Sequence, residues 1–211
     1  MKICEIFKSI QGESSYAGWP FVFVRFTGCN LRCAFCDTTY AFEEGFEISE
    51  KKLLERITLY GIKSIEITGG EPLLQKGVYA LTENLIKRGY TVLLETNGTM
   101  DISRLNRNII RVIDIKCPGS GESDKTRWEN LDNLRKGDEV KFVIMNRDDY
   151  EWAKRISKKF SLTERFTVNL SPAYNFLPQQ KLAGWILEDN LHVRFNLQLH
   201  KYIWKGITRG V

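Results

Sequence analysis

Short apolar runs rich in β-branched and aromatic residues alternate along the chain with longer segments of helical period. The runs predict strands over residues 21–26, 64–68, 91–95, 109–115, 139–145, 166–170 and 192–197. The segments between them predict helices over residues 49–59, 76–88, 102–107, 125–135, 149–160 and 178–189. Such alternation favours parallel strands joined by right-handed crossovers. The pattern therefore predicts an α/β fold whose sheet is either open or curled toward a barrel.

Polar or glycine-rich segments follow five of the predicted strands. They are residues 29–40, 68–72, 95–98, 114–116 and 169–172. The carboxyl ends of parallel strands meet at one face of a curled sheet, where such folds build their sites. Arg25 adds to this picture because it is a charged residue in the apolar run 21–26, and a buried guanidinium needs an anionic partner. We expect these segments to line one pocket.

Composition narrows the class of protein. A chain of 211 residues with 43% hydrophobic content can bury a sizeable core, and we expect a single domain over residues 1–211. Its apolar stretches are shorter than a bilayer requires and its start lacks a signal-peptide pattern, so we expect a cytoplasmic protein with no membrane partner. The net charge is +5, but basic and acidic residues are interleaved, which argues against a nucleic-acid partner. Five cysteines, an odd number, indicate free thiols rather than disulfides.

Three of the cysteines, Cys29, Cys33 and Cys36, lie within eight residues. Three thiolates supply one ligand fewer than a closed tetrahedral metal site needs, which leaves a position for water, substrate or cofactor. A zinc site would need a fourth ligand such as His192 or His200, both far along the sequence. An iron–sulfur cluster needs only the three thiolates.

The cysteine spacing, with three and then two intervening residues, resembles the motif of the radical S-adenosylmethionine (SAM) superfamily. The resemblance implies an incomplete (β/α)6 barrel, here with an extra C-terminal strand. It also implies a [4Fe-4S] cluster held by the three cysteines. The open iron of this cluster binds SAM, and electron transfer from the cluster cleaves SAM to a 5′-deoxyadenosyl radical. Residues 69–72 are similar to the superfamily's glycine-rich motif, in which the backbone approaches the methionine moiety.

Further contacts to SAM follow from the same resemblance. Phe35 is expected beside the adenine, and Lys116 is expected to neutralise the cofactor carboxylate. The expected cofactor-binding residues are Phe35, Cys36, Asp37, Gly70, Asp114, Ile115 and Lys116. Thr96 and Asn97 either bind the ribose or carboxylate or form an ordinary turn, since Asn-Gly is a common turn dipeptide.

Additional motifs resemble the 7-carboxy-7-deazaguanine synthase family of queuosine and deazapurine biosynthesis. They are residues 10–13, 23–26, 36–38 and 198–204, which together span most of the chain. The resemblance implies a carbon–nitrogen lyase that converts 6-carboxy-5,6,7,8-tetrahydropterin to 7-carboxy-7-deazaguanine with loss of ammonia. One departure is Ser14, where glycine is frequent in the family, so the roles of residues 13–15 stay open.

The family resemblance also implies a substrate site, a metal and partners. The expected substrate-binding residues are Ile10, Gln11, Gly12, Arg25, Thr68 and Val211. Arg25 is expected to meet the substrate carboxylate because its fork geometry fits. Thr38 is the expected Mg²⁺ ligand, a hard oxygen donor. A reductant such as flavodoxin or ferredoxin and a homodimer are expected as well.

Two alternatives remain open from the residues. The first is a glycyl-radical activase that acts on a protein partner, from which the Gln11, Gly12 and Arg25 set would distinguish a small-molecule enzyme. The second is a zinc-binding RNA module that draws on the basic charge and the five tryptophans.

Overall fold

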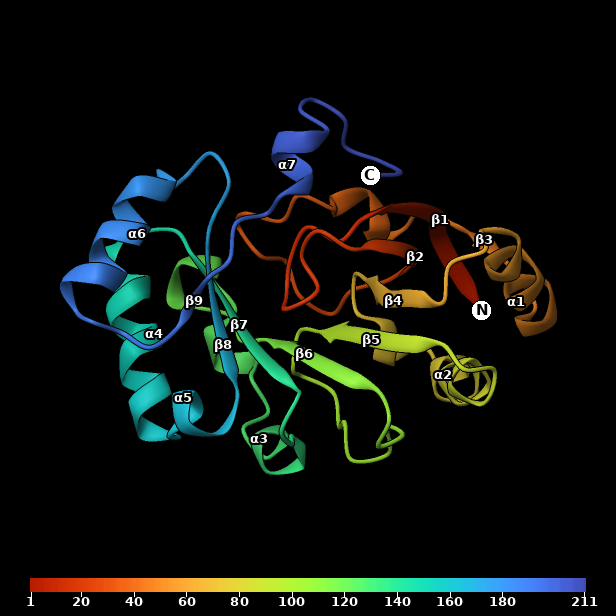
Figure 1. Cartoon of the computed structure of the whole chain (residues 1–211), viewed down its shortest axis with the longest axis horizontal. Helices are drawn as coiled ribbons and strands as arrows, with labels where there is room; N and C mark the ends of the chain where they lie inside the picture. Colours follow the sequence, from red (N-terminus) through yellow and green to blue (C-terminus); the bar gives the residue numbers. More distant parts are fainter.

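The computed structural model describes residues 1–211 and contains one open sheet of nine strands in the order β3-β1-β2-β4-β5-β6-β7-β8-β9. In this order, the seven strands β2, β4, β5, β6, β7, β8 and β9 run parallel to one another. Their bounds are β2 (Pro20–Phe26), β4 (Ser64–Gly69), β5 (Thr91–Thr96), β6 (Ile110–Asp114), β7 (Glu139–Ile144), β8 (Thr167–Pro172) and β9 (Arg194–Phe195). Six long parallel strands and a short final one confirm the predicted incomplete barrel with an extra C-terminal strand (Figure 1).

Two antiparallel strands at the start of the sheet were not predicted. They are β1 (Lys2–Ile10), which pairs with β2, and β3 (Phe46–Glu47), which pairs with β1. A β-bulge between Ile3 and Glu5 interrupts the register of β1, so its apolar residues do not alternate with period two. The sequence pattern of a strand is lost at this bulge.

The longer helices agree with the predicted segments. They are α1 (Glu50–Leu59), α2 (Gly77–Lys87), α4 (Arg147–Lys159) and α6 (Gln179–Glu188), and the shorter ones are α3 (Asn130–Asn133), α5 (Leu162–Arg165) and α7 (His200–Ile203). The Ser49 side chain caps α1 by accepting a hydrogen bond from the Lys52 backbone N–H. Figure 1 shows α1 and α2 beside one end of the sheet and α4 to α6 beside the other, with α7 and the C-terminus above β2. None of the helices has both the length and the apolar character needed to span a bilayer.

Three predicted elements are wrong or too long. Residues 102–107 form turns rather than a helix, because the Asp101 and Asn106 side chains accept hydrogen bonds from the Ser103 and Asn108 N–H groups at 2.8 Å and so compete with helical bonding. In the predicted helix 125–135 only α3 is formed. In the predicted strand 192–197 only β9 pairs with β8.

Side chains alternate between two faces of the parallel strands. One face carries the main hydrophobic cluster, which includes Val24 of β2, Ile67 of β4 and Leu94 of β5 together with apolar residues of the helices. The other face begins with a small aromatic cluster around Phe23 and Leu93. Towards the carboxyl ends of the strands this second face becomes polar, which places charged side chains inside the curve of the sheet.

Candidate active site

A cavity of about 670 Å³ lies at the carboxyl ends of the strands. It is bounded by the cysteine loop (residues 29–40) and by the C-terminal segment (residues 198–211). Fourteen of the residues with predicted roles line it together. They are Ile10, Gln11, Gly12, Arg25, Cys29, Cys33, Phe35, Cys36, Asp37, Thr38, Thr68, Gly70, Asp114 and Lys116. Val211 also lines the cavity, whereas the Ile115 side chain lies fully buried in the hydrophobic core. The predicted residues thus share one cavity, apart from Ile115.

The cysteine loop forms one wall of the cavity. The Ala34 N–H donates to the Ser120 carbonyl at 3.0 Å, and the Arg32 N–H donates to the Glu122 carboxylate at 2.6 Å, so the loop is fastened to the turn after β6. Burial raises the pKa of the Cys33 thiol to about 11, and the Lys116 ammonium opposes this shift. Binding of a metal to this thiol therefore releases a proton.

Gly70 is held against the base of the cysteine loop. A Cβ atom at this position would lie 2.2 Å from the Gly28 carbonyl oxygen and 2.7 Å from the Cys29 Cβ atom. The next N–H, of Glu71, donates to that same Gly28 carbonyl at 2.8 Å. The glycine motif therefore has a structural reason in addition to the expected approach to a cofactor, since no side chain fits between β4 and the loop.

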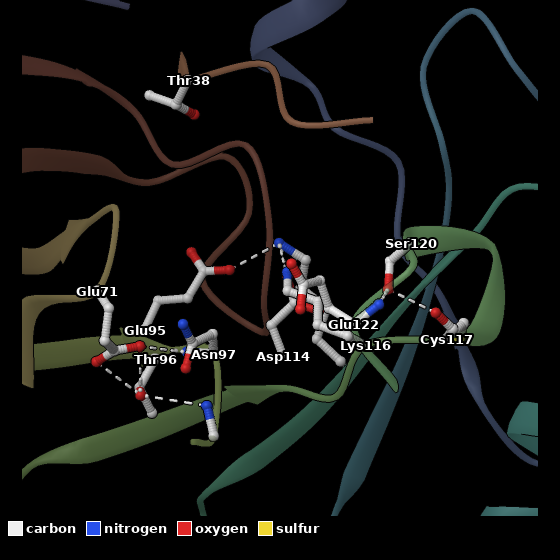
Figure 2. Close-up of polar contacts among 12 residues, drawn as sticks. Thr38, Glu71, Glu95, Thr96, Asn97, Asp114, Lys116, Cys117, Ser120 and Glu122 are labelled. Atoms are coloured by element: carbon white, nitrogen blue, oxygen red, sulfur yellow. Dashed lines mark hydrogen bonds and ion pairs between the residues drawn. The ribbon is translucent and has the colours of Figure 1, made fainter. Parts of the chain in front are cut away.

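Glu71 is fully buried and organises the end of β5 (Figure 2). Its carboxylate accepts hydrogen bonds from the Thr96 hydroxyl at 2.9 Å, the Asn97 N–H at 2.7 Å and the Leu73 N–H at 3.0 Å. Burial nevertheless raises the pKa of Glu71 to about 7. The Thr96 hydroxyl is thus engaged inside the protein, while the Asn97 amide reaches Asn30 at 3.0 Å.

Lys116 forms a buried ion pair beside the cysteine loop. Its Nζ atom lies 2.7 Å from the Asp114 Oδ2 atom and 5.8 Å from the centre of the Phe35 ring. Burial disfavours the charged amine, but Asp114 and the Cys33 sulfur raise the pKa of Lys116 above its ordinary value. The predicted cation is therefore present at the strand end, already paired with a carboxylate of the same segment (Figure 2).

The floor of the cavity carries a charge cluster that the sequence analysis missed. Lys141 of β7 lies 2.5 Å from Glu13, 2.7 Å from Glu95 and 3.8 Å from Asp114. These carboxylates raise the pKa of Lys141 well above its ordinary value despite its burial. The signal was available, because Lys141 and Glu95 stand in or directly after apolar runs, as Arg25 does.

Gln11 faces the same cluster. Its side-chain amide donates to the buried Glu66 carboxylate of β4. Burial and the nearby Glu95 raise the pKa of Glu66 well above its ordinary value. The floor therefore presents amide, carboxyl and ammonium groups side by side, which suits a ligand with several donors and acceptors.

Arg25 and Thr38 lie on the side of the cavity next to the C-terminal segment. The anionic partner of Arg25 within the chain is Glu5, whose Oε1 atom lies 2.7 Å from the Arg25 Nε atom. The Thr38 hydroxyl donates to Asp37 at 2.7 Å, and Asp37 forms an ion pair with Lys201. Burial opposes ionisation, but Lys201 lowers the pKa of Asp37 below its ordinary value. Figure 2 shows Thr38 well apart from the strand-end residues.

The C-terminal segment closes the cavity over the first motif of the chain. The Leu199 N–H donates to the Gly12 carbonyl at 3.0 Å, and a Cβ atom on Gly12 would lie 2.2 Å from the His200 Nδ1 atom. A side chain at position 12 would displace the His200 ring, so glycine allows α7 to pack closely on the Gln11–Gly12 segment. Burial lowers the pKa of His200, and the other histidine, His192, is exposed and does not line the cavity.

Comparison with known proteins identifies the family. The model of the radical SAM superfamily matches residues 23–160. A 7-carboxy-7-deazaguanine synthase of Koribacter versatilis is 43% identical over 100% of both chains, and one of Chlorobaculum tepidum is 41% identical over 100% of this chain and 97% of the relative. The chain belongs to the 7-carboxy-7-deazaguanine synthase family. A crystal structure of QueE from Escherichia coli shares the fold, with a TM-score of 0.78 and 24% identity over 93% of each chain.

Membership of the 7-carboxy-7-deazaguanine synthase family decides between the alternatives left open by the residues. Both the glycyl-radical activase and the zinc-binding RNA module are wrong, because full-length relatives carry the synthase name. Other solved structures share the fold at lower similarity. The structure of Streptococcus suis SuiB bound to S-adenosylmethionine matches with a TM-score of 0.56 and 13% identity over 83% of this chain and 51% of that chain.

The residues present fit the cofactors of a radical SAM enzyme. The cysteine loop offers three free thiols, and no histidine lies in it. No group of three His, Cys, Asp or Glu side chains is arranged to hold a single metal ion. A four-iron cluster takes each thiolate at a different iron, so it needs its three ligands farther apart than a single ion does. The three free thiols at the cavity are a donor set that would suit a [4Fe-4S] cluster.

Proposed function

We propose that this chain is a carbon–nitrogen lyase that converts 6-carboxy-5,6,7,8-tetrahydropterin to 7-carboxy-7-deazaguanine with loss of ammonia, in queuosine and deazapurine biosynthesis. The observation that carries the proposal is the 43% identity over the whole chain to a protein of that name. The cavity supports it, because it combines three cysteines, an arginine and a polar floor. The proposed unit is a single domain over residues 1–211.

The cysteine wall holds the cofactors. Cys29, Cys33 and Cys36 would hold the [4Fe-4S] cluster, which together with SAM supplies the 5′-deoxyadenosyl radical when both are bound. Phe35 and Gly70 flank the place for SAM on this wall, and the Asp114–Lys116 pair lies beside them. The Lys116 ammonium attracts the carboxylate of SAM, while the protein backbone of residues 35–37 and 114–116 shapes the remainder of the site.

The opposite wall and the floor bind the pterin. Arg25 offers a charged fork for the substrate carboxylate. The amide of Gln11, with the backbone of Ile10 and Gly12, offers donors and acceptors to the heterocycle. Thr68 lies at the end of β4 and contacts the substrate from below. Val211 lines the cavity and is a further substrate-binding residue of the proposal.

Mg²⁺ and the partners complete the proposal. Thr38 is the proposed Mg²⁺ ligand, a hydroxyl oxygen at the cavity. The neighbouring Asp37 is engaged by Lys201, which leaves the hydroxyl as the freer oxygen donor. A flavodoxin or ferredoxin supplies the electron in the cytoplasm. The exposed residues Tyr202, Ile203 and Trp204 form part of a homodimer interface.

One anaerobic assay tests the proposed function. The reconstituted protein is incubated with SAM, reductant, Mg²⁺ and 6-carboxytetrahydropterin, and the deazaguanine product is identified by mass spectrometry. The Cys33→Ala variant serves as the control, since it removes one cluster ligand. A brown protein that forms the product only with all three cysteines supports the proposal. A reconstituted protein that cleaves SAM but leaves the pterin unchanged contradicts it.

A further inference from the structure

Glu5 is a half-buried carboxylate beside Arg25. The two residues face each other on β1 and β2, and their side chains are only 15% and 17% exposed. Glu5 does not line the cavity, whereas Arg25 does. Glu5 therefore acts on a ligand in the cavity through neighbours that line it, and among the side chains bonded to it Arg25 is the charged one.

The bulge in β1 turns Glu5 toward Arg25. In a regular strand Ile3 and Glu5 would share a face, because side chains two residues apart point the same way. Ile3 instead lies in the main hydrophobic core, while Phe7 stacks on Phe23 in the aromatic cluster on the inner face. The register shift lies between Ile3 and Glu5. The bulge thus redirects a carboxylate that would otherwise point into the apolar core.

Three hydrogen bonds hold the Glu5 carboxylate in place. Its Oε1 atom accepts from the Arg25 Nε–H at 2.7 Å and from the Tyr40 hydroxyl at 2.9 Å. Its Oε2 atom accepts from the Gly210 N–H of the C-terminal segment at 3.0 Å. A carboxylate held at both oxygens is unable to swing away from the guanidinium.

This arrangement leaves the end of the Arg25 fork available. Only the Nε atom of Arg25 makes a hydrogen bond within the protein, and neither terminal nitrogen makes one. A guanidinium binds a carboxylate best through two parallel N–H bonds, and the two terminal nitrogens form one such pair. The hydrogen bond through Nε therefore fixes the orientation of the guanidinium and leaves both terminal nitrogens free to bind a ligand.

We propose that Glu5 is a positioning residue: it holds Arg25 by the Nε atom so that both terminal nitrogens face the carboxylate of the substrate. The inference rests on the proposed function, in which Arg25 binds that carboxylate. Charge alone predicts the opposite effect, because the negative Glu5 weakens the attraction of Arg25 for another anion. Position and charge can therefore be separated by experiment.

Two substitutions separate them. Glu5→Asp keeps the charge and withdraws the acceptor by one methylene, whereas Glu5→Gln removes the charge and keeps an acceptor oxygen at the same reach. The probes are 6-carboxypterin and pterin without the carboxylate, both fluorescent, titrated into the reconstituted, SAM-loaded protein in the dark. Glu55→Gln on the exposed face of α1 is the matched control. Iron content and thermal unfolding are measured for each variant.

The expected result is a loss of affinity for 6-carboxypterin of about tenfold in Glu5→Asp and of less than about threefold in Glu5→Gln, since a misdirected charged hydrogen bond costs about that much. Affinity for pterin stays unchanged in both. The inference is overturned if Glu5→Gln loses more affinity than Glu5→Asp, or if the two probes weaken together.

The Arg25→Ala variant distinguishes failure of the positioning role of Glu5 from failure of the proposed function. If Arg25→Ala removes the preference for 6-carboxypterin over pterin and Glu5→Asp does not reduce it, only the positioning role fails. If Arg25→Ala keeps the preference, the assignment of Arg25 to the substrate carboxylate fails with it.

Discussion

The buried carboxyl group of Glu71 makes the stability of the folded state depend on pH. Its pKa of about 7 exceeds the ordinary 4.5, because burial outweighs three hydrogen bonds to the ionised form. Between these two values the folded chain binds a proton that the unfolded chain releases. Stability from this group is therefore fully present below pH 4.5 and is lost as the pH rises to about 7.

Glu71→Gln should consequently be more harmful at low pH than at high pH. The variant cannot ionise, so its deficit in free energy of unfolding against the parent should shrink by about 2 kcal/mol between pH 5.5 and pH 8, as linkage gives for such a shift. Urea unfolding of both proteins at the two pH values measures this difference. A deficit that is equal at both values would show that Glu71 has an ordinary pKa.

Thr38→Ala should weaken the response to Mg²⁺ because it removes the proposed oxygen ligand. The Mg²⁺ concentration for half-maximal product formation should rise about tenfold, as expected for loss of one such ligand. Thr38→Ser keeps the hydroxyl and should remain close to the parent. If magnesium activates the alanine variant and the parent equally, Thr38 is not the ligand.

Single residues show which parts of the site a sequence reveals. Arg25 was identifiable because a charge in an apolar run must find a partner, and Glu66 and Lys141 obey the same rule within β4 and β7. Their pairing was not predictable, because Lys141 meets Glu13 across more than a hundred residues of sequence. Ile115 shows the opposite case, since its place in a motif did not bring its side chain to the cavity.

At the scale of elements, periodicity predicted the parallel strands and long helices because both bury one regular face. It failed where local polar bonds replaced that regularity, as in the turns at Asp101 and Asn106. It also failed at β1, whose bulge places Ile3 and Glu5 on different faces. The bulged strand β1 reaches the cavity at Ile10, whereas the turns at Asp101 and Asn106 do not line it.

The junction of β4 with the cysteine loop gives a prediction at this scale. Gly70→Ala places a methyl group 2.2 Å from the Gly28 carbonyl oxygen, so backbone must move at the base of the loop. We expect a loss of stability of about 2 kcal/mol, as for other overpacked sites, and fewer irons bound per chain. Urea unfolding and iron analysis measure the two effects.

Gly184→Ala in α6 is the matched control for that substitution. A Cβ atom there meets no heavy atom within 4 Å, so it should stabilise the helix by about 0.5–1 kcal/mol through helix propensity. Normal iron content in Gly70→Ala would mean that the loop accommodates the methyl group.

For the whole molecule, the pooling of strand ends was predictable from topology, because parallel strands bring their carboxyl ends to one face. The C-terminal segment that covers this face was not predictable from topology. It is fastened by pairs far apart in sequence, such as Trp204 with Ser9 at 3.1 Å and Arg209 with Glu44 at 2.8 Å. No local sequence pattern predicts contacts between residues so far apart in the chain.

Arg209→Ala tests whether the Arg209–Glu44 pair holds the C-terminal segment in place over the cavity. The Arg209–Glu44 pair is exposed, so its loss should leave the thermal unfolding temperature unchanged. Backbone amides of residues 206–211 should exchange with solvent faster, and 6-carboxypterin should bind about threefold more weakly, because part of the cavity wall becomes mobile. Hydrogen exchange and fluorescence titration measure both. Arg127→Ala, which removes another exposed ion pair, is the control and should change neither.

The crossing of α7 over Gly12 also fixes an order of events in the cell. The chain is synthesised from its N-terminus, so the cysteine loop leaves the ribosome long before His200 exists to pack on Gly12. The cavity wall that α7 contributes is therefore among the last parts of the site to form, after the strand ends and the cysteine loop that it faces.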